Sequence, residues 1–255
     1  MSAGKRKGLL WALAAVGIGA CFAALLPSIA KHVPWRIERW MDHAVGASAL
    51  LRPCRGKAQP GSLAAFNKLV ARLYPLDAED RELPITVDVI AGDTINAFAA
   101  LDGHIHVFEG LIRHVQSPEE LAGVIAHEIE HVRGRHIMQG LAVNLFTLTA
   151  LSSALPSDSP TNSRIAYTLL GMKFSRQQEA EADEHGLNRL RAAQVDAAGF
   201  GHFFARAERS SAAPAWLSSH PSSEARAELA RRAANFPTTA ILTNAEWRAL
   251  GAICQ

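Results

Sequence analysis

Cysteine is scarce in this chain, and so is any excess of charge outside its first few residues. Three cysteines in 255 residues are too few for a fold built on disulfides. The formal net charge is +2, but Lys5, Arg6 and Lys7 alone supply +3. Residues 31–255 therefore carry 23 basic and 24 acidic side chains, a balance that argues against a nucleic-acid-binding protein. Internal repeats and low-complexity tracts are also absent, and the 49% hydrophobic content is that of an ordinary globular domain.

Charge is absent altogether from residues 9–30, a run of 22 mostly apolar residues. About 20 such residues span a bilayer, and a basic flank stays in the cytoplasm, so residues 31–255 would be exported. In a bacterium, this predicts a single-pass inner-membrane protein with its bulk in the periplasm. A cleaved signal peptide and a lipoprotein signal are the alternatives, because Ser28-Ile29-Ala30 resembles a cleavage site and Cys21 follows small residues.

Export permits a disulfide between Cys54 and Cys254, the two cysteines beyond the apolar run. Such a bond would tie the start of the exported part to its end. Two free, buried thiols are an equally good interpretation of the sequence. The pairing therefore stays open at this point.

The remaining pattern predicts an α+β fold that is mostly helical, with a small sheet ahead of the main helices. We expect residues 1–30 to form the anchor or signal, residues 31–61 a turn-rich lead-in, and residues 62–255 the functional domain. Strands are predicted at 84–90 and in a hairpin that joins 95–100 to 104–108 through Asp102-Gly103. Helices are predicted from a cap at Ser62 to about 73, from a Ser117-Pro118 start to about 153, and at about 164–193, 197–208, 222–235 and 245–250.

Histidine is unusually frequent, with 11 residues, and two of them lie in the run His127-Glu128-Ile129-Glu130-His131. Residues four apart share one face of a helix, so His127 and His131 can bind one Zn²⁺. Glu128 lies about 100° around the helix from His127, close to a metal there without being obliged to bind it. A carboxylate in that place can accept a proton from a zinc-bound water. The run therefore favours a zinc-dependent hydrolase over a helix with exposed histidines.

A catalytic zinc usually has three protein ligands and one open position, so a third ligand is needed. The extension HExxHxxGxxH would need a histidine where Ile137 stands, and His136 would point about 140° away on a continuing helix. We interpret His136 as a surface residue or one that contacts a ligand without binding the metal. Glu179 and Asp183 share a helix face, where the first can bind the metal and the second can orient a ligand histidine. Taken alone, this pair is more typical of a soluble acidic helix face.

Together these motifs resemble the M48 family of zinc metallopeptidases, of the HtpX type. The resemblance rests on the HEIEH run followed by Arg135-His136, and on the element Glu-x-x-Ala-Asp at 179–183. It extends to Ile95–Ala99 ahead of the hairpin, Phe108–Ile112 after it, and His220-Pro221 beyond the main helices. The match covers about residues 85–235, and the flanks are similar to those of small membrane-anchored bacterial members.

The resemblance implies roles at the metal. His127, His131 and Glu179 would bind one Zn²⁺ per chain. Glu128 would act as the general base and then as the acid. Asp183 would orient a ligand through a hydrogen bond.

The resemblance also implies roles around the metal. His220 would help to stabilise the tetrahedral oxyanion, although a surface histidine in a Ser-rich loop is the alternative. Arg226 would anchor a nearby element through an ion pair. Asn96, His104 and His106 would flank the cleft, where an extended peptide could add to the second strand of the hairpin as an extra strand.

The chain is thus predicted to be an exported zinc metalloendopeptidase that hydrolyses peptide bonds of exported or envelope proteins. Its domain would be zincin-like, with the small sheet beside the HExxH helix. Its partners would be protein or peptide substrates and the membrane, and not nucleic acid. One rival is a chaperone-like envelope assembly or quality-control factor that uses the zinc cleft mainly to bind proteins. The other is a structural membrane protein in which the HExxH run is fortuitous.

Overall fold

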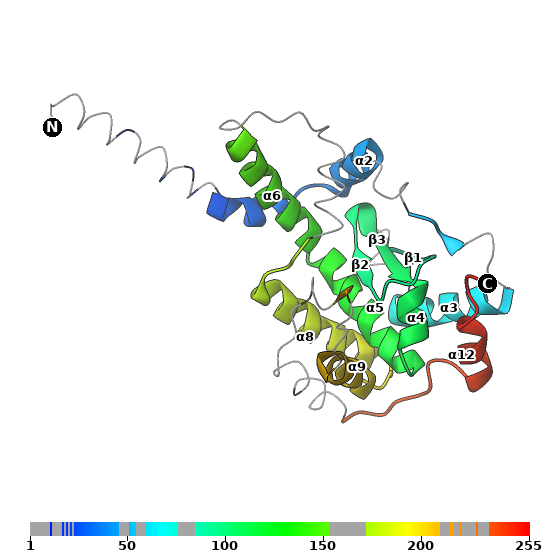
Figure 1. Ribbon diagram of the computed structural model, residues 1–255. Coiled ribbons are helices and arrows are strands. Elements are labelled where there is room, and N and C mark those ends of the chain that lie inside the picture. The colour runs from blue at the N-terminus through cyan, green and yellow to red at the C-terminus, as the bar shows by residue number, and fades with distance from the viewer. Residues whose placement is uncertain are drawn as a thin grey trace.

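The computed structural model shows a mostly helical protein with one small mixed sheet (Figure 1). It describes residues 23–45, 51–54, 60–75, 85–152, 172–209 and 235–255, together with positions 11, 17, 19, 21, 215, 216, 220 and 228. The α+β class expected from the sequence is confirmed at this level. One hydrophobic core joins the helices to the sheet and includes the buried side chains of Phe66, Ile105, Leu121 and Phe203.

The N-terminal part differs from the prediction. Ten of the 22 residues of the apolar run at 9–30 lie outside the described residues, and no helix within the described part is long and apolar enough to cross a bilayer. The lead-in, expected to consist of turns, contains helix α2 (Trp35–Val45). Glu38 and Asp42 of α2 are buried, whereas Trp40 is 69% exposed. The sequence does carry an apolar stripe at helical spacing, which includes Ile37 and Trp40, but both side chains are exposed and the acidic face is the one that packs inward.

The sheet consists of β1 (Thr86–Ile90), β2 (Ala97–Ala99) and β3 (His104–Phe108). Their order is β1-β3-β2, with β3 parallel to β1 and antiparallel to β2. The predicted hairpin is confirmed, and Asp102 and Gly103 in its turn have positive φ values of 53° and 74°. The prediction that strand 104–108 is open to an added peptide strand is wrong, because β1 and β2 pair with both of its sides. Among the described strands, β2 is an edge of the sheet.

Two helices, α5 (Pro118–Arg133) and α6 (His136–Ser152), replace the single helix expected from Ser117 to about residue 153. The start is as predicted, because the Ser117 side chain accepts a hydrogen bond from the backbone N–H of Glu120. The helix stops after Arg133, since Gly134 caps α5 and Arg135 has a positive φ of 58°. Residues beyond this break therefore do not continue the helix face that carries the HExxH run.

The other helices are α3 (Pro60–Leu73), α4 (Glu109–His114), α8 (Arg176–Ala192), α9 (Ala198–Arg209) and α12 (Asn244–Leu250). α5 packs against α8 and α9, and α12 packs against α3. Ser62 does not cap α3 as predicted, because it lies inside the first turn and its hydroxyl donates to the carbonyl of Ala249 at 2.6 Å. α8 begins later than predicted, because Ser175 forms a capping box with Gln178. Residues 164–171 and nearly all of 222–235, where helices were predicted, lie outside the described residues.

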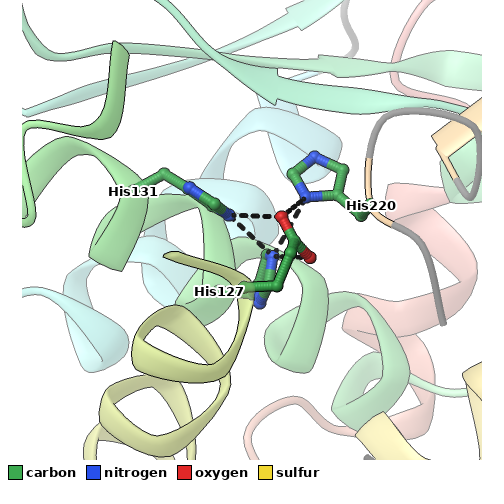
Figure 2. A group of neighbouring side chains, drawn as sticks. His127, His131 and His220 are labelled. Carbon is green, nitrogen blue, oxygen red and sulfur yellow. Dashed lines mark hydrogen bonds and ion pairs between the residues drawn. The ribbon is translucent and has the colours of Figure 1, made fainter. Parts of the chain in front are cut away.

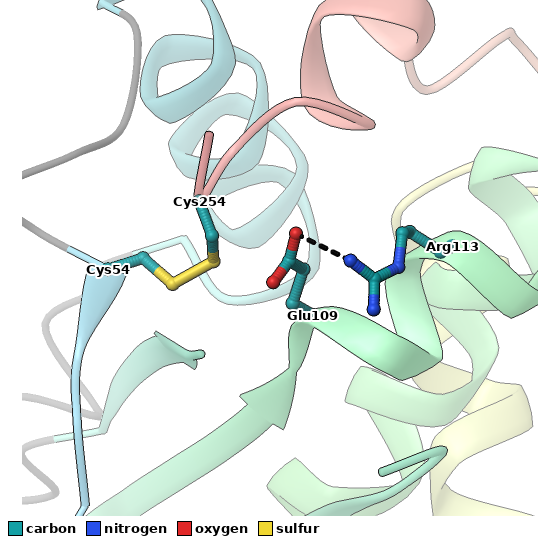
Figure 3. The surroundings of a disulfide bond; sticks show 4 residues. All are labelled: Cys54, Glu109, Arg113 and Cys254. Carbon is teal, nitrogen blue, oxygen red and sulfur yellow. Dashed lines mark hydrogen bonds and ion pairs between the residues drawn. A yellow bond between two sulfur atoms is a disulfide. The ribbon is translucent and has the colours of Figure 1, made fainter. Parts of the chain in front are cut away.

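Cys54 and Cys254 form a disulfide, which selects the first of the two interpretations of the sequence (Figure 3). Their Cα atoms are 5.1 Å apart, and 200 residues separate them along the chain. Beside the bond, Arg113 and Glu109 of α4 form an ion pair at 2.9 Å. The disulfide thus ties the segment ahead of α3 to the end of the chain.

Candidate metal centre

Helix α5 holds both histidines and the first glutamate of the HExxH motif inside the molecule, where all three side chains are 0% exposed. Helix α8 packs closely against this stretch because Gly186 has no side chain. A Cβ at Gly186 would lie 3.4 Å from the backbone of His127, so the two helices are already at contact distance. This packing places Glu179 and Asp183 of α8 beside the histidines of the motif.

Four buried side chains converge on one point: His127, His131, Glu179 and His220. One nitrogen or oxygen atom of each lies within 4.8 Å of all the others. The Nε2 atoms of His127 and His131 are 2.9 Å apart, and Glu179 Oε1 lies 3.4 Å from His131 Nε2 and 3.0 Å from His220 Nδ1. Figure 2 shows the three histidines turned toward the same carboxylate. The structure therefore brings the three residues expected to bind zinc together, and it adds His220 to them.

Each histidine of the motif contacts another buried group through its second ring nitrogen. Asp183 Oδ1 lies 2.9 Å from His127 Nδ1. His136 Nδ1 lies 3.0 Å from His131 Nδ1, and His136 is 1% exposed. His136 thus contacts a candidate ligand, but the expectation that it points away from His131 is wrong, because the helix break at Arg135 turns the chain back.

The protonation of the cluster suits a cation. Asp183 as a carboxylate can only accept, so it favours a proton on His127 Nδ1 and leaves a lone pair on Nε2. Burial lowers the pKa of His131 well below its usual value, so this ring is neutral too. Burial raises the pKa of Glu179, but its close contacts with the rings of His131 and His220 outweigh it and hold that pKa well below its usual range. Neutral imidazoles and an ionised carboxylate that converge in a dry site are the ligands that Zn²⁺ takes in proteins.

Glu128 lies beside the cluster, and both of its carboxylate oxygens accept hydrogen bonds. The backbone N–H of Ala99, in β2, donates to Oε2 at 3.0 Å, and the indole N–H of Trp216 donates to Oε1 at 2.8 Å. His220 Nε2 lies 3.4 Å from Oε1. Burial raises the pKa of Glu128 to about 6, against the opposing effects of His220 and Trp216. A carboxyl group with a pKa near neutrality is suited both to accept and to return a proton.

Two aromatic residues of the site were not predicted from the sequence. Trp216 is fully buried, and its ring stacks on that of His220 with centroids 4.6 Å apart. The ring of Phe174 stacks on His131 at 3.9 Å. The sequence signal for Trp216 is its spacing, because it lies four residues before His220, one helical turn away. In the structure its carbonyl accepts a helix-like hydrogen bond from the His220 N–H.

The residues expected to flank the cleft have other partners in the structure. His106 is 3% exposed and packs 5.2 Å from the ring of Phe98, and burial lowers its pKa to about 4. His104 Nδ1 lies 2.8 Å from the hydroxyl of Thr86 in β1. Asn96 is half-buried just ahead of β2, where its carbonyl accepts the backbone N–H of Phe108. Arg226 lies outside the described residues.

The part of the chain that builds this cluster is similar to known proteins. Residues 65–234 match the family model described as peptidase family M48. The chain belongs to peptidase family M48. In this M48 chain, the matched range contains the HExxH motif, Glu179 and Asp183 of α8, and His220.

Curated relatives of this M48 chain include proteases of bacteria and of mitochondria. A putative beta-barrel assembly-enhancing protease of Vibrio cholerae is 33% identical over 178 residues, which are 63% of this chain and 37% of the relative. The beta-barrel assembly-enhancing protease of Escherichia coli is 30% identical over 198 residues, 71% of this chain and 40% of the relative. The mitochondrial metalloendopeptidase OMA1 of Arabidopsis thaliana is 33% identical over 151 residues, 57% of this chain and 30% of the relative. The matches thus span well under half of these relatives.

Proposed function

We propose that this M48 protein is a zinc-dependent metalloendopeptidase that hydrolyses peptide bonds of exported or envelope proteins. The observation that carries the proposal is the buried convergence of His127, His131 and Glu179, with Glu128 alongside. This arrangement combines three ligands of the types that zinc uses with a carboxyl group able to move a proton. The relatives, which are beta-barrel assembly-enhancing proteases and a mitochondrial metalloendopeptidase, agree with it.

The proposed chemistry assigns a task to each group. A zinc ion held by His127, His131 and Glu179 supplies Lewis acidity toward the scissile carbonyl and lowers the pKa of water. Glu128 accepts the proton that the attacking water gives up, and it later returns that proton to the leaving amine. The hydrogen bonds from Ala99 and Trp216 fix the direction of its carboxylate, so the carboxylate is preorganised to accept the proton. Asp183 keeps His127 in the tautomer that presents Nε2 to the metal.

His220 has two proposed positions. In the geometry described, its Nδ1 completes a set of four candidate ligands, and a set of four protein ligands is typical of a closed zinc site. Catalysis requires one open position, so we propose that His220 withdraws from the cluster when substrate binds. It would then donate a hydrogen bond to the oxyanion, as the family resemblance implies.

The proposed peptide-binding edge is β2, since β3 is paired on both sides. β2 reaches the site directly, because the N–H of Ala99 contacts Glu128. Its approach is occupied in the structure, where the backbone N–H of Trp216 donates to the carbonyl of Ile95 at 3.3 Å. A substrate strand would therefore replace the backbone hydrogen bond between Trp216 and Ile95 before it pairs with β2, while the Trp216 indole keeps its contact with Glu128.

The proposed location is the bacterial inner membrane, with residues 1–30 as a single anchor and the catalytic domain in the periplasm. A secreted periplasmic protein or a lipoprotein is the alternative. The support is the uncharged run at 9–30 behind a basic flank, together with a disulfide, which oxidising compartments favour.

The test compares the full-length protein in detergent with its Glu128→Gln variant. Both should bind one zinc per chain, and cleavage of an unfolded protein such as casein should fall by about 10²- to 10⁴-fold in the variant. Glu184→Gln, which removes an exposed carboxylate of α8, is the matched control and should cleave normally. Zinc binding without cleavage by any form would favour the chaperone-like alternative. Absence of stoichiometric zinc would contradict the metal site itself.

A further inference from the structure

The break between α5 and α6 places His136 beside the metal cluster. A continuous helix would carry His136 away from His131, but the positive φ of Arg135 turns the chain so that the two rings face each other. Gly134 makes room for this turn. A Cβ at that position would lie 2.4 Å from His136 Nε2, so any other residue would push the ring out of place.

Helix α2 stabilises the strained residue of the break. The Arg135 guanidinium pairs with the buried carboxylate of Glu38 and donates to the carbonyl of Val33. It also lies over the ring of Trp35, 3.7 Å from its centroid. A residue with positive φ is stable where several surrounding contacts hold it in place, and these three contacts hold Arg135 in this way.

The contacts of His136 define a chain of hydrogen bonds that ends at the candidate ligand. A ligand that offers Nε2 to the metal carries its proton on Nδ1, so His131 Nδ1 donates to His136 Nδ1 at 3.0 Å. His136 then carries its own proton on Nε2, where Glu181 Oε2 lies 3.4 Å away and accepts it. Every donor in this series of hydrogen bonds has an acceptor. Because the Glu181 carboxylate can only accept, it sets the direction of the hydrogen bonds from His136 back to His131.

We infer that His136 is a positioning residue that fixes the tautomer and the ring orientation of His131 for metal binding. It would do for His131 what Asp183 does for His127, with an imidazole in place of a carboxylate. The inference rests on the metal site of the proposed function, but not on peptide cleavage. Removal of such a partner typically weakens metal binding by about 10- to 100-fold.

The test measures zinc affinity by competition with a chromophoric chelator, using the full-length protein in the Glu128→Gln background. His136→Leu keeps the apolar packing but has no acceptor, and we expect its zinc dissociation constant to rise by about 10- to 100-fold. His136→Asn places an amide oxygen near the position of Nδ1 and should recover most of the affinity. His185→Leu, at an exposed histidine of the same α8 that carries Glu181, is the matched control and should bind zinc normally.

A second measurement addresses the mechanism directly. In protein labelled with ¹⁵N-histidine, the ring nitrogens of His131 should report a single Nδ1–H tautomer in the parent and a mixture in His136→Leu. Gly134→Ala, which retains the imidazole but displaces it, should weaken zinc binding even if His136→Leu does not fold. Parent-like affinity and an unchanged His131 tautomer in both variants would overturn the inference. If zinc affinity and the His131 tautomer respond as expected but the wild-type protein cleaves no protein substrate, only the proposed function is contradicted.

Discussion

The metal cluster and the ion pair between Glu38 and Arg135 are both buried, but the polar atoms of the two regions have neighbours of different charge. In the ion pair, opposite charges face each other, and Glu38 also accepts the backbone N–H of Asp102 at 3.0 Å. In the cluster, the Nε2 atoms of His127 and His131 point at each other from 2.9 Å, and an acidic side chain adjoins them. An ion pair neutralises its own charge on burial, whereas three imidazoles gathered around one carboxylate offer a set of donor atoms that a cation would stabilise. The first region should therefore determine stability, and the second should determine metal affinity.

Metal removal should produce the largest effect and so is the strongest test of this difference. Chelation should abolish cleavage and lower the free energy of unfolding by about 4 kcal/mol, relative to free zinc at a thousand times its dissociation constant. Denaturant titrations with and without zinc measure the change. A Lys68→Gln variant, which breaks the exposed ion pair between α3 and α12, should lose the same amount on chelation, because distant sites contribute additively. Equal stabilities with and without zinc would show that the cluster is not a metal site.

The disulfide offers the opposite case, a contact that should matter for stability alone. Replacing Cys54 and Cys254 together by Ser should lower the free energy of unfolding by about 4 kcal/mol, because a bond across 200 residues greatly restricts the unfolded chain. Zinc affinity should stay within about twofold of the parent. Cys21→Ser, at a free and exposed cysteine, is the control and should change neither quantity. A large loss of zinc affinity in the double variant would mean that the disulfide also shapes the site.

The pH dependence of stability should single out Glu38. Burial raises its pKa from 4.5 to about 7, against the opposing effect of Arg135, so between these values the folded protein holds a proton that the unfolded chain releases. This stabilisation is complete below about pH 4.5 and is lost as the pH rises through 7. From pH 4.5 to 8, wild type should therefore lose about 3 kcal/mol relative to Glu38→Gln. Chemical denaturation of both proteins across this range gives the difference, and a pH-independent difference would contradict the raised pKa.

The convergence of the candidate ligands can be expected from the sequence more readily than the elements around them, for a physical reason. His127 and His131 are four residues apart on a well-capped helix, and Glu179 and Asp183 repeat that spacing on another, so local geometry alone fixes each pair. The packing of the two pairs depends on Gly186, a residue whose role appears only when a partner helix lies against it.

The errors occurred where distant contacts override local pattern. The HExxH helix stops at Gly134 because Arg135 finds partners in α2, a helix about one hundred residues earlier in the chain. α2 was itself missed, although its apolar residues repeat at helical spacing, and its acidic face is buried because that same arginine compensates Glu38. Strand β3 was expected at an edge because the sequence shows its hairpin partner but not the parallel pairing with β1. Each error therefore concerns a pairing between segments that are remote in sequence.

Two helix caps of the same kind give the smallest and most closely matched comparison. Ser175 caps α8 and Thr243 caps α12, each through a capping box in which the side chain three residues later bonds back. Replacing either by Ala should cost about 1 kcal/mol of stability, because one backbone N–H loses its acceptor. Glu179 follows Ser175 by one turn, so fraying of α8 should also weaken zinc binding a few-fold in Ser175→Ala. Thr243→Ala should leave zinc binding unchanged, because α12 packs on α3 and is remote from the cluster in sequence and contact. Equal zinc affinities in the two variants, at equal losses of stability, would mean that Glu179 is held by its contacts with the histidines rather than by the helix that carries it.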